Sequence, residues 1–298
     1  MNDVTFNKKG TIKYLIWTFL ITWIMQVIAA VLHWKGLTAF GQLLMSIMMF
    51  APLLGVLLSG HTLSGMGWKP HLKGKIKMLF IAWFLPAFLT AIGAALYFVV
   101  FPGHFDTSGE YLVTAAGPEI LEQLEAQGLT YSLYVLIGVV SSLTYAPLIN
   151  LFLAVGEEAG WRGFLYPQLK AKFGKRQGWL IGGVIWGIWH WPLIWLIGYE
   201  YGTEYAGFPI VGMLIFCIYT TVAGIVCDWL YEKTECIWIP SIFHGAVNAA
   251  ATVPLVLCTT NTGSSILLVP VPNGVLAEVP FIICAIIILF KSEKQKEQ

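Results

Sequence analysis

Residues 12–34 read IKYLIWTFLITWIMQVIAAVLHW, an almost unbroken apolar run that follows Lys8 and Lys9. A helix needs about 20 such residues to cross the hydrocarbon core of a bilayer. The run is too long for the apolar part of a signal peptide, so we expect it to stay in the protein as a first membrane span.

The composition of the whole chain agrees with a lipid environment. Of its 298 residues, 57% are hydrophobic and 11% are charged. A soluble domain carries about a quarter charged residues, so these few charges cannot cover a water-facing surface of this size. A backbone inside lipid must satisfy its own hydrogen bonds, which favours helices. The sequence therefore predicts an all-α, polytopic membrane helix bundle that forms a single integral membrane domain over residues 1–298.

Apolar runs of spanning length recur along the chain, and we predict about eight transmembrane helices from them. The expected spans are residues 12–34, 38–59, 76–101, 131–155, 179–198, 209–231, 238–257 and 275–290.

Charge in the connections predicts the orientation. Lys and Arg gather in both tails and in alternate connections, whereas the opposite connections are acidic and hold one cation, Lys35. Because cytoplasmic loops carry an excess of Lys and Arg, we expect a multi-pass protein of the cell membrane with both termini in the cytoplasm. Residues 102–130 would form an external loop. Residues 156–178 would form a helix at the cytoplasmic interface, broken near Pro167.

Two observations narrow the classes of partner and function. The net charge is +1, which argues against a basic face for nucleic acid. The chain shows no internal repeat, which weakens a transporter built from inverted repeats.

Ionisable side chains inside apolar segments are costly and indicate function. Glu157 and Glu158 follow the fourth predicted span, and Arg162 comes one helical turn later. Arg162 can pair with Glu158 on one helical face, which leaves Glu157 free for chemistry. A charged helix end at the membrane interface would explain the same three residues equally well.

Two histidine motifs lie in later spans. His190 lies well inside the fifth predicted span, one turn after Trp186, and the i, i+4 spacing puts His244 and Asn248 on one face. Each could be a structural group, a histidine bonded to a carbonyl or a polar bond between helices. If the three helices pack together, we expect these side chains to meet Glu157 in one cavity open to the cytoplasm.

A carboxylate and an imidazole around one water form a general-base site, and a second imidazole with an amide can bind an oxyanion. The chain has no Gly-x-Ser-x-Gly motif, so water activation is favoured over a covalent nucleophile. Glu157, His190 and His244 would alternatively supply three ligands to Zn²⁺ or another divalent metal and leave a position open. The sequence leaves both forms open.

The three motifs together resemble those of the CAAX protease and bacteriocin-processing family, also called type II CAAX prenyl endopeptidases or Abi proteins. They are Glu157-Glu158-x-x-x-Arg162, the aromatic-x-x-x-His of Trp186 to His190, and His244-x-x-x-Asn248, in the family's order. Trp186 stands where the family usually has Phe. The resemblance implies an intramembrane endopeptidase with its catalytic core at about residues 131–257.

By this resemblance, Glu157 and His190 activate water, His244 and Asn248 stabilise the oxyanion, and Glu158 and Arg162 shape the site. Members of the family are described both as metalloproteases and as glutamate-dependent enzymes. The implied partners are membrane lipid and a peptide or protein substrate, which is lipidated in the family's namesake reaction. Two other functions remain open: a non-catalytic membrane scaffold or bacteriocin-immunity partner, and a transporter or proton relay.

Overall fold

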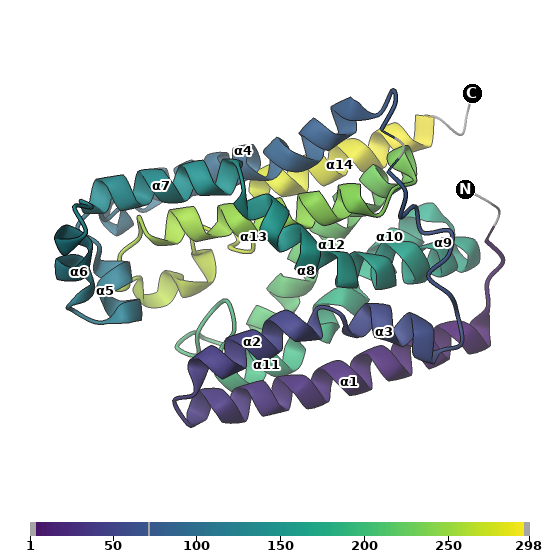
Figure 1. Ribbon diagram of the computed structural model, residues 1–298, viewed down its shortest axis with the longest axis horizontal. Coiled ribbons are helices and arrows are strands. Elements are labelled where there is room, and N and C mark those ends of the chain that lie inside the picture. Colours follow the sequence, from purple (N-terminus) through teal and green to yellow (C-terminus); the bar gives the residue numbers. More distant parts are fainter. Residues whose placement is uncertain (1–3, 71, 295–298) are drawn as a thin grey trace.

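The chain forms a bundle of helices in the computed structural model, which describes residues 4–70 and 72–294 (Figure 1). Within these residues there is no named strand, only an isolated bridge between Phe105 and Cys258. The prediction of an all-α fold is therefore confirmed. The helices are α1 (Lys8–Trp34), α2 (Thr38–Met48), α3 (Ala51–Leu58), α4 (Ile76–Val100), α5 (Glu110–Ala116), α6 (Ile120–Ala126), α7 (Tyr131–Leu143), α8 (Ala146–Gly160), α9 (Tyr166–Phe173), α10 (Lys175–Trp189), α11 (Trp191–Ile197), α12 (Ile210–Thr234), α13 (Trp238–Leu255) and α14 (Val279–Lys294).

Several of these helices are long and apolar enough to cross a membrane. Four spans pass this test in the described part of the chain: α1, α4, α12, and α10 together with α11. Two bent pairs also pass, α2 with α3 at 44° and α6 with α7 at 86°, which raises the number to as many as six. Helix α14 is apolar but shorter. The protein is therefore a multi-pass membrane bundle, roughly consistent with the eight predicted spans, and its orientation stays a prediction.

Helix α1 shows how the bundle is built for lipid. Its apolar side chains, such as Leu20 and Ile24, are exposed, while Thr22 and Gln26 are fully buried. The Gln26 amide donates to the Trp189 carbonyl at 2.9 Å, and the Trp189 indole donates to the Thr22 hydroxyl at 2.7 Å. The polar stripe of α1 thus docks against the end of α10, because polar groups in lipid need protein partners.

Three predicted spans are broken rather than continuous. The segment 38–59 divides into α2 and α3, 131–155 into α7 and α8, and 179–198 into α10 and α11. In each case the second helix carries a proline in its first turn, Pro52, Pro147 or Pro192. Proline lacks the backbone N–H and disfavours a helical conformation in the residue before it, so a helix restarts there more easily than it continues.

The two long connections also differ from their predictions. Residues 102–130 contain α5 and α6, so this segment is not a simple loop. The segment predicted to lie at the membrane interface continues α8 through a π-helical turn, Trp161–Leu165, into α9. Trp161 and Leu165 are fully buried in the protein, so their apolar surface faces the core rather than a membrane interface. Pro167 lies in the first turn of α9, after the π-helical turn.

The core forms around α8, which packs against α13 and α3, and around the pair α10 and α12. Glycines allow the close approach: a Cβ on Gly245 of α13 would lie 2.7 Å from the backbone nitrogen of Leu151 on α8. A Cβ on Gly183 of α10 would lie 2.3 Å from the Cα of Thr221 on α12. Small residues at helix contacts let backbones pack closely in lipid, and here they bring the motif-bearing helices together.

Candidate active site

The motif residues come from the middle of the bundle. Glu157 and Glu158 lie in the last turn of α8 and are 2% and 0% exposed. His244 lies on α13, which packs along α8. His190 lies inside the candidate span formed by α10 and α11, as predicted, and is the residue between the two helices. The break before Pro192 therefore determines where the His190 backbone lies.

A cavity of about 330 Å³ brings four of the predicted residues together. Glu157, His190, His244 and Asn248 all line it. Glu158 and Arg162 do not line it and lie behind it, in contact with His244 and Trp186. The rest of the lining comes from α2, α10, α12 and α13 and from the connections at residues 49, 199–200 and 272–273, so segments distant in sequence enclose one space.

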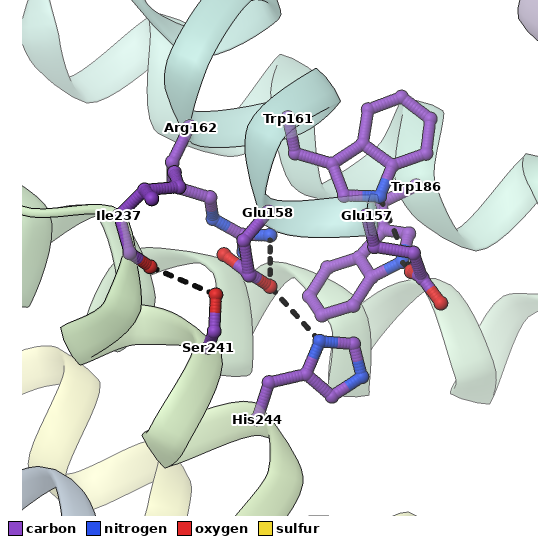
Figure 2. Close-up of polar contacts among 8 residues, drawn as sticks. All are labelled: Glu157, Glu158, Trp161, Arg162, Trp186, Ile237, Ser241 and His244. Carbon is purple, nitrogen blue, oxygen red and sulfur yellow. Dashed lines mark hydrogen bonds and ion pairs between the residues drawn. The ribbon is translucent and has the colours of Figure 1, made fainter. Parts of the chain in front are cut away.

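Two tryptophans hold the Glu157 carboxylate (Figure 2). Its Oε2 atom accepts hydrogen bonds from the Trp186 indole at 2.7 Å and from the Trp161 indole at 3.2 Å. The Oε1 atom accepts none of the hydrogen bonds found among the described residues. One oxygen is therefore fixed, and the other is left for a group in the cavity.

Glu158 joins two partners through a single oxygen (Figure 2). Its Oε1 atom lies 3.1 Å from Arg162 Nη1 and 2.9 Å from His244 Nδ1. The predicted pairing of Glu158 with Arg162 is thus present. Because a carboxylate accepts, Nδ1 carries the proton and Nε2 is the His244 nitrogen left for the cavity.

His190 is oriented by its own helix. Its Nδ1 lies 3.0 Å from the Trp186 carbonyl, one turn earlier. A carbonyl only accepts, so Nδ1 donates and the neutral ring keeps its lone pair on Nε2. The ring also packs edge-on against Phe216 at 4.7 Å. The sequence allowed a structural histidine bonded to a carbonyl, and that bond exists here in a residue that also lines the cavity.

Sequence reasoning missed the roles of the two indoles. Trp161 follows Glu157 by one turn, so the i, i+4 rule could have indicated that contact. Trp186 was singled out only as a neighbour of His190. Its bond to Glu157 joins α10 to α8, and no spacing along the chain reveals a contact between separate helices.

The arrangement gives no direct support to a metal centre. In residues 4–70 and 72–294, no group of three His, Cys, Asp or Glu side chains is placed to hold a metal ion. Glu157 already accepts from two indoles, and His244 Nδ1 is bonded to Glu158. The predicted metal ligands Glu157, His190 and His244 stay a prediction.

Two comparisons with known proteins match the part of the chain that carries the site. Residues 139–250 match the model of the Rce1-like family, described as type II CAAX prenyl endopeptidase. Over 110 residues the chain is 30% identical to the CAAX prenyl protease 2 of Methanococcus maripaludis. That match covers 36% of this chain and 40% of the length of the relative. The segment that contains all three motifs is therefore similar to the Rce1-like, type II CAAX prenyl endopeptidase family.

Proposed function

We propose that the protein is an intramembrane endopeptidase that hydrolyses a peptide bond of a membrane-associated peptide or protein. The observation that carries this proposal is the single cavity lined by Glu157, His190, His244 and Asn248. The name of the archaeal relative adds that a CAAX prenyl protease shares the segment. We place the catalytic core at about residues 131–257 of one integral membrane domain.

Glu157 and His190 would activate the attacking water. The free Oε1 of Glu157 takes a proton from the water while the indoles hold Oε2 in place. The His190 Nε2 lone pair accepts the second water hydrogen and orients the oxygen. A carboxylate removed from bulk water is a stronger base than an exposed one, which suits this role.

His244 and Asn248 would bind the developing oxyanion. As water attacks the carbonyl carbon, the π electrons move to the carbonyl oxygen. The charged Glu158 carboxylate on Nδ1 stabilises the protonated His244 ring, whose Nε2–H then donates to this oxygen. The Asn248 amide, one turn later on α13, is the second donor. Collapse of the intermediate breaks the C–N bond, and Glu157 returns its proton to the leaving amine.

We propose the glutamate-dependent form of this chemistry. The support is the pair of indole bonds, which orient Glu157 for proton transfer without any further ligand. A divalent metal on Glu157, His190 and His244 would instead polarise the water, and no step above depends on it. Chelation followed by metal analysis of the purified protein distinguishes the two forms, since a metalloprotease loses activity with the metal and recovers it on addition.

The experiment is cleavage by the purified full chain in detergent, followed by mass spectrometry. The substrates are a prenylated CAAX peptide and an unmodified peptide library. Glu157→Gln should lower cleavage by about 100-fold or more, because a general base is lost. Its thermal unfolding midpoint should stay close to that of the wild type. Glu204→Gln, an exposed acid of the α11–α12 connection, is the control and should cleave normally.

Two results would contradict the proposal. One is full activity in Glu157→Gln or His190→Ala. The other is binding of substrate without any cleavage by the wild type, which would favour the scaffold. Flux of a solute or of protons into proteoliposomes, dependent on Glu157, would favour the transporter or proton relay.

A further inference from the structure

A second carboxylate, which the proposed chemistry does not use, faces the same cavity. Glu200 lies in the connection between α11 and α12 and lines the cavity together with Glu157 and His190. Glu200 is an exposed residue. Its φ angle is 69°, in the left-handed region that residues with a side chain rarely adopt. Such a conformation is costly and persists only where the surrounding fold holds it in place. Residues of this kind cluster at functional sites.

Buried groups hold this carboxylate from behind. Asn273 Nδ2 donates to Glu200 Oε2 at 3.0 Å, and the Tyr201 hydroxyl donates to the Asn273 carbonyl at 2.9 Å. Asn273 is 4% exposed and Tyr201 is 1% exposed. An amide orients a carboxylate but does not neutralise it. No ion pair with Lys or Arg is found for Glu200 among the described residues.

The surroundings of Glu200 suit an organic cation. Two carboxylates line the cavity, and no Lys or Arg of the described chain does. The wall beside Glu200 is aromatic: the ring centroids of Tyr199 and Phe216 are 6.3 Å apart, and those of Phe216 and Tyr219 are 5.5 Å apart. Aromatic faces attract ammonium and guanidinium groups, and a carboxylate fixes where the charge sits.

We infer that Glu200 is a specificity-determining residue that binds a basic side chain, Lys or Arg, of the peptide in the cavity. This inference rests on the proposed endopeptidase function and adds one requirement to it. The substrate carries its positive charge within reach of the α11–α12 connection while the bond to be cut lies between Glu157 and His244. A bound cation would give Glu200 the partner of opposite charge that the described residues do not supply.

The test compares peptides that differ at one position. Lys, norleucine and Glu are placed in turn at each residue of a peptide that the purified wild type cleaves. At one position the wild type should cleave the Lys peptide about tenfold faster than the norleucine peptide, since the Lys ammonium would gain contact with both the Glu200 carboxylate and the aromatic wall. Glu200→Gln keeps an acceptor for Asn273 and should bring the ratio near one. Glu204→Gln is the matched control and should keep the preference.

A binding experiment distinguishes failure of this inference from failure of the proposed endopeptidase function. The Lys and norleucine peptides carry a photoreactive diazirine and are crosslinked to Glu157→Gln, with and without Glu200→Gln. Labelling by the Lys peptide should fall about tenfold in the double variant, because the Lys ammonium loses its contact with the Glu200 carboxylate. An unchanged Lys preference after Glu200→Gln, or no preference in the wild type, overturns the inference and leaves the endopeptidase standing. Labelling that depends on Glu200 without any cleavage overturns the endopeptidase and supports the cationic subsite.

Discussion

At the scale of single residues, Trp186 links the groups on which the proposed chemistry depends. Its indole donates to Glu157, and its carbonyl accepts from His190. Its ring lies 4.5 Å from the Arg162 guanidinium carbon, and its centroid is 5.3 Å from that of His244. A phenylalanine here could reproduce the ring contacts but not the hydrogen bond. The indole at this position therefore gives Glu157 a hydrogen bond that phenylalanine could not supply.

Trp186→Phe tests that hydrogen bond. The change keeps the ring and removes one hydrogen bond to a charged group, worth about 1.5–3 kcal/mol. We expect kcat to fall by about tenfold to a hundredfold while KM stays unchanged, because the lost bond positions the base rather than the substrate. Trp83→Phe, which removes an indole bond to the Leu143 carbonyl away from the cavity, is the control. Equal losses in both variants would assign Trp186 a purely structural role.

Arg162 and Glu158 form an ion pair, and both side chains are fully buried. The Arg162 guanidinium carbon also lies 4.7 Å from the ring centroid of Tyr166 and 4.5 Å from that of Trp186. The sequence could predict the Arg162–Glu158 pair because one helical turn separates them. It could not predict that His244 shares the same oxygen, since that contact depends on how α13 packs on α8.

Removing one member of this pair should cost more than removing both. Arg162→Met leaves the Glu158 charge in the core and should destabilise the protein by about 3 kcal/mol or more. Arg162→Met combined with Glu158→Gln should regain part of that loss, since neither variant side chain is charged. Thermal unfolding midpoints in detergent measure both effects. A double variant less stable than Arg162→Met would show that the pair is not the source of the loss.

At the scale of elements, the breaks in the helices place the site. Hydropathy located the apolar segments, because it measures length and composition. It did not find the restarts of α3, α8 and α11, although Pro52, Pro147 and Pro192 were visible in the sequence. A proline in a long apolar run can kink a spanning helix or start a new one, and tertiary packing decides which.

Pro192→Ala tests the break at His190. Alanine supplies the backbone N–H that proline lacks and removes the clash of the proline ring with the preceding helical turn, so α10 can continue into α11. We expect cleavage to fall by at least about tenfold, because an error of about 1 Å in a catalytic group can cost a hundredfold. The thermal midpoint should stay equal or rise. Pro102→Ala, in a connection away from the cavity, is the control, and normal cleavage by Pro192→Ala would show that the break is not needed.

At the scale of the whole molecule, the sequence predicted an all-α membrane bundle because its composition excludes a water-facing surface. It did not predict α5 and α6, since short helices in a connection leave little periodic pattern. It also could not show that α1 packs against α11. Figure 1 shows the start of α1 and the end of α14 at one end of the bundle, with α5 and α6 at the other.

The predicted orientation can be measured directly. Fusing a fluorescent protein to the C-terminus should give a fluorescent product, and fusing alkaline phosphatase there should give an inactive one, because Lys-rich ends stay in the cytoplasm. The reverse pattern should appear for fusions truncated in the 102–130 connection. Active phosphatase at the C-terminus would require an odd number of crossings or an inverted protein.

The hydrogen bonds that join Thr22 and Gln26 to Trp189 have a consequence for any shortened version of this protein. The family match begins at residue 139. Thr22 and Gln26, which bind Trp189 just before His190, therefore lie outside the matched residues. A version trimmed to the matched residues 139–250 would keep Glu157, His190, His244 and Asn248 but would lose both hydrogen bonds from α1. Any shortened version should therefore keep α1, because this helix helps to position the residue before His190 as well as crossing the membrane.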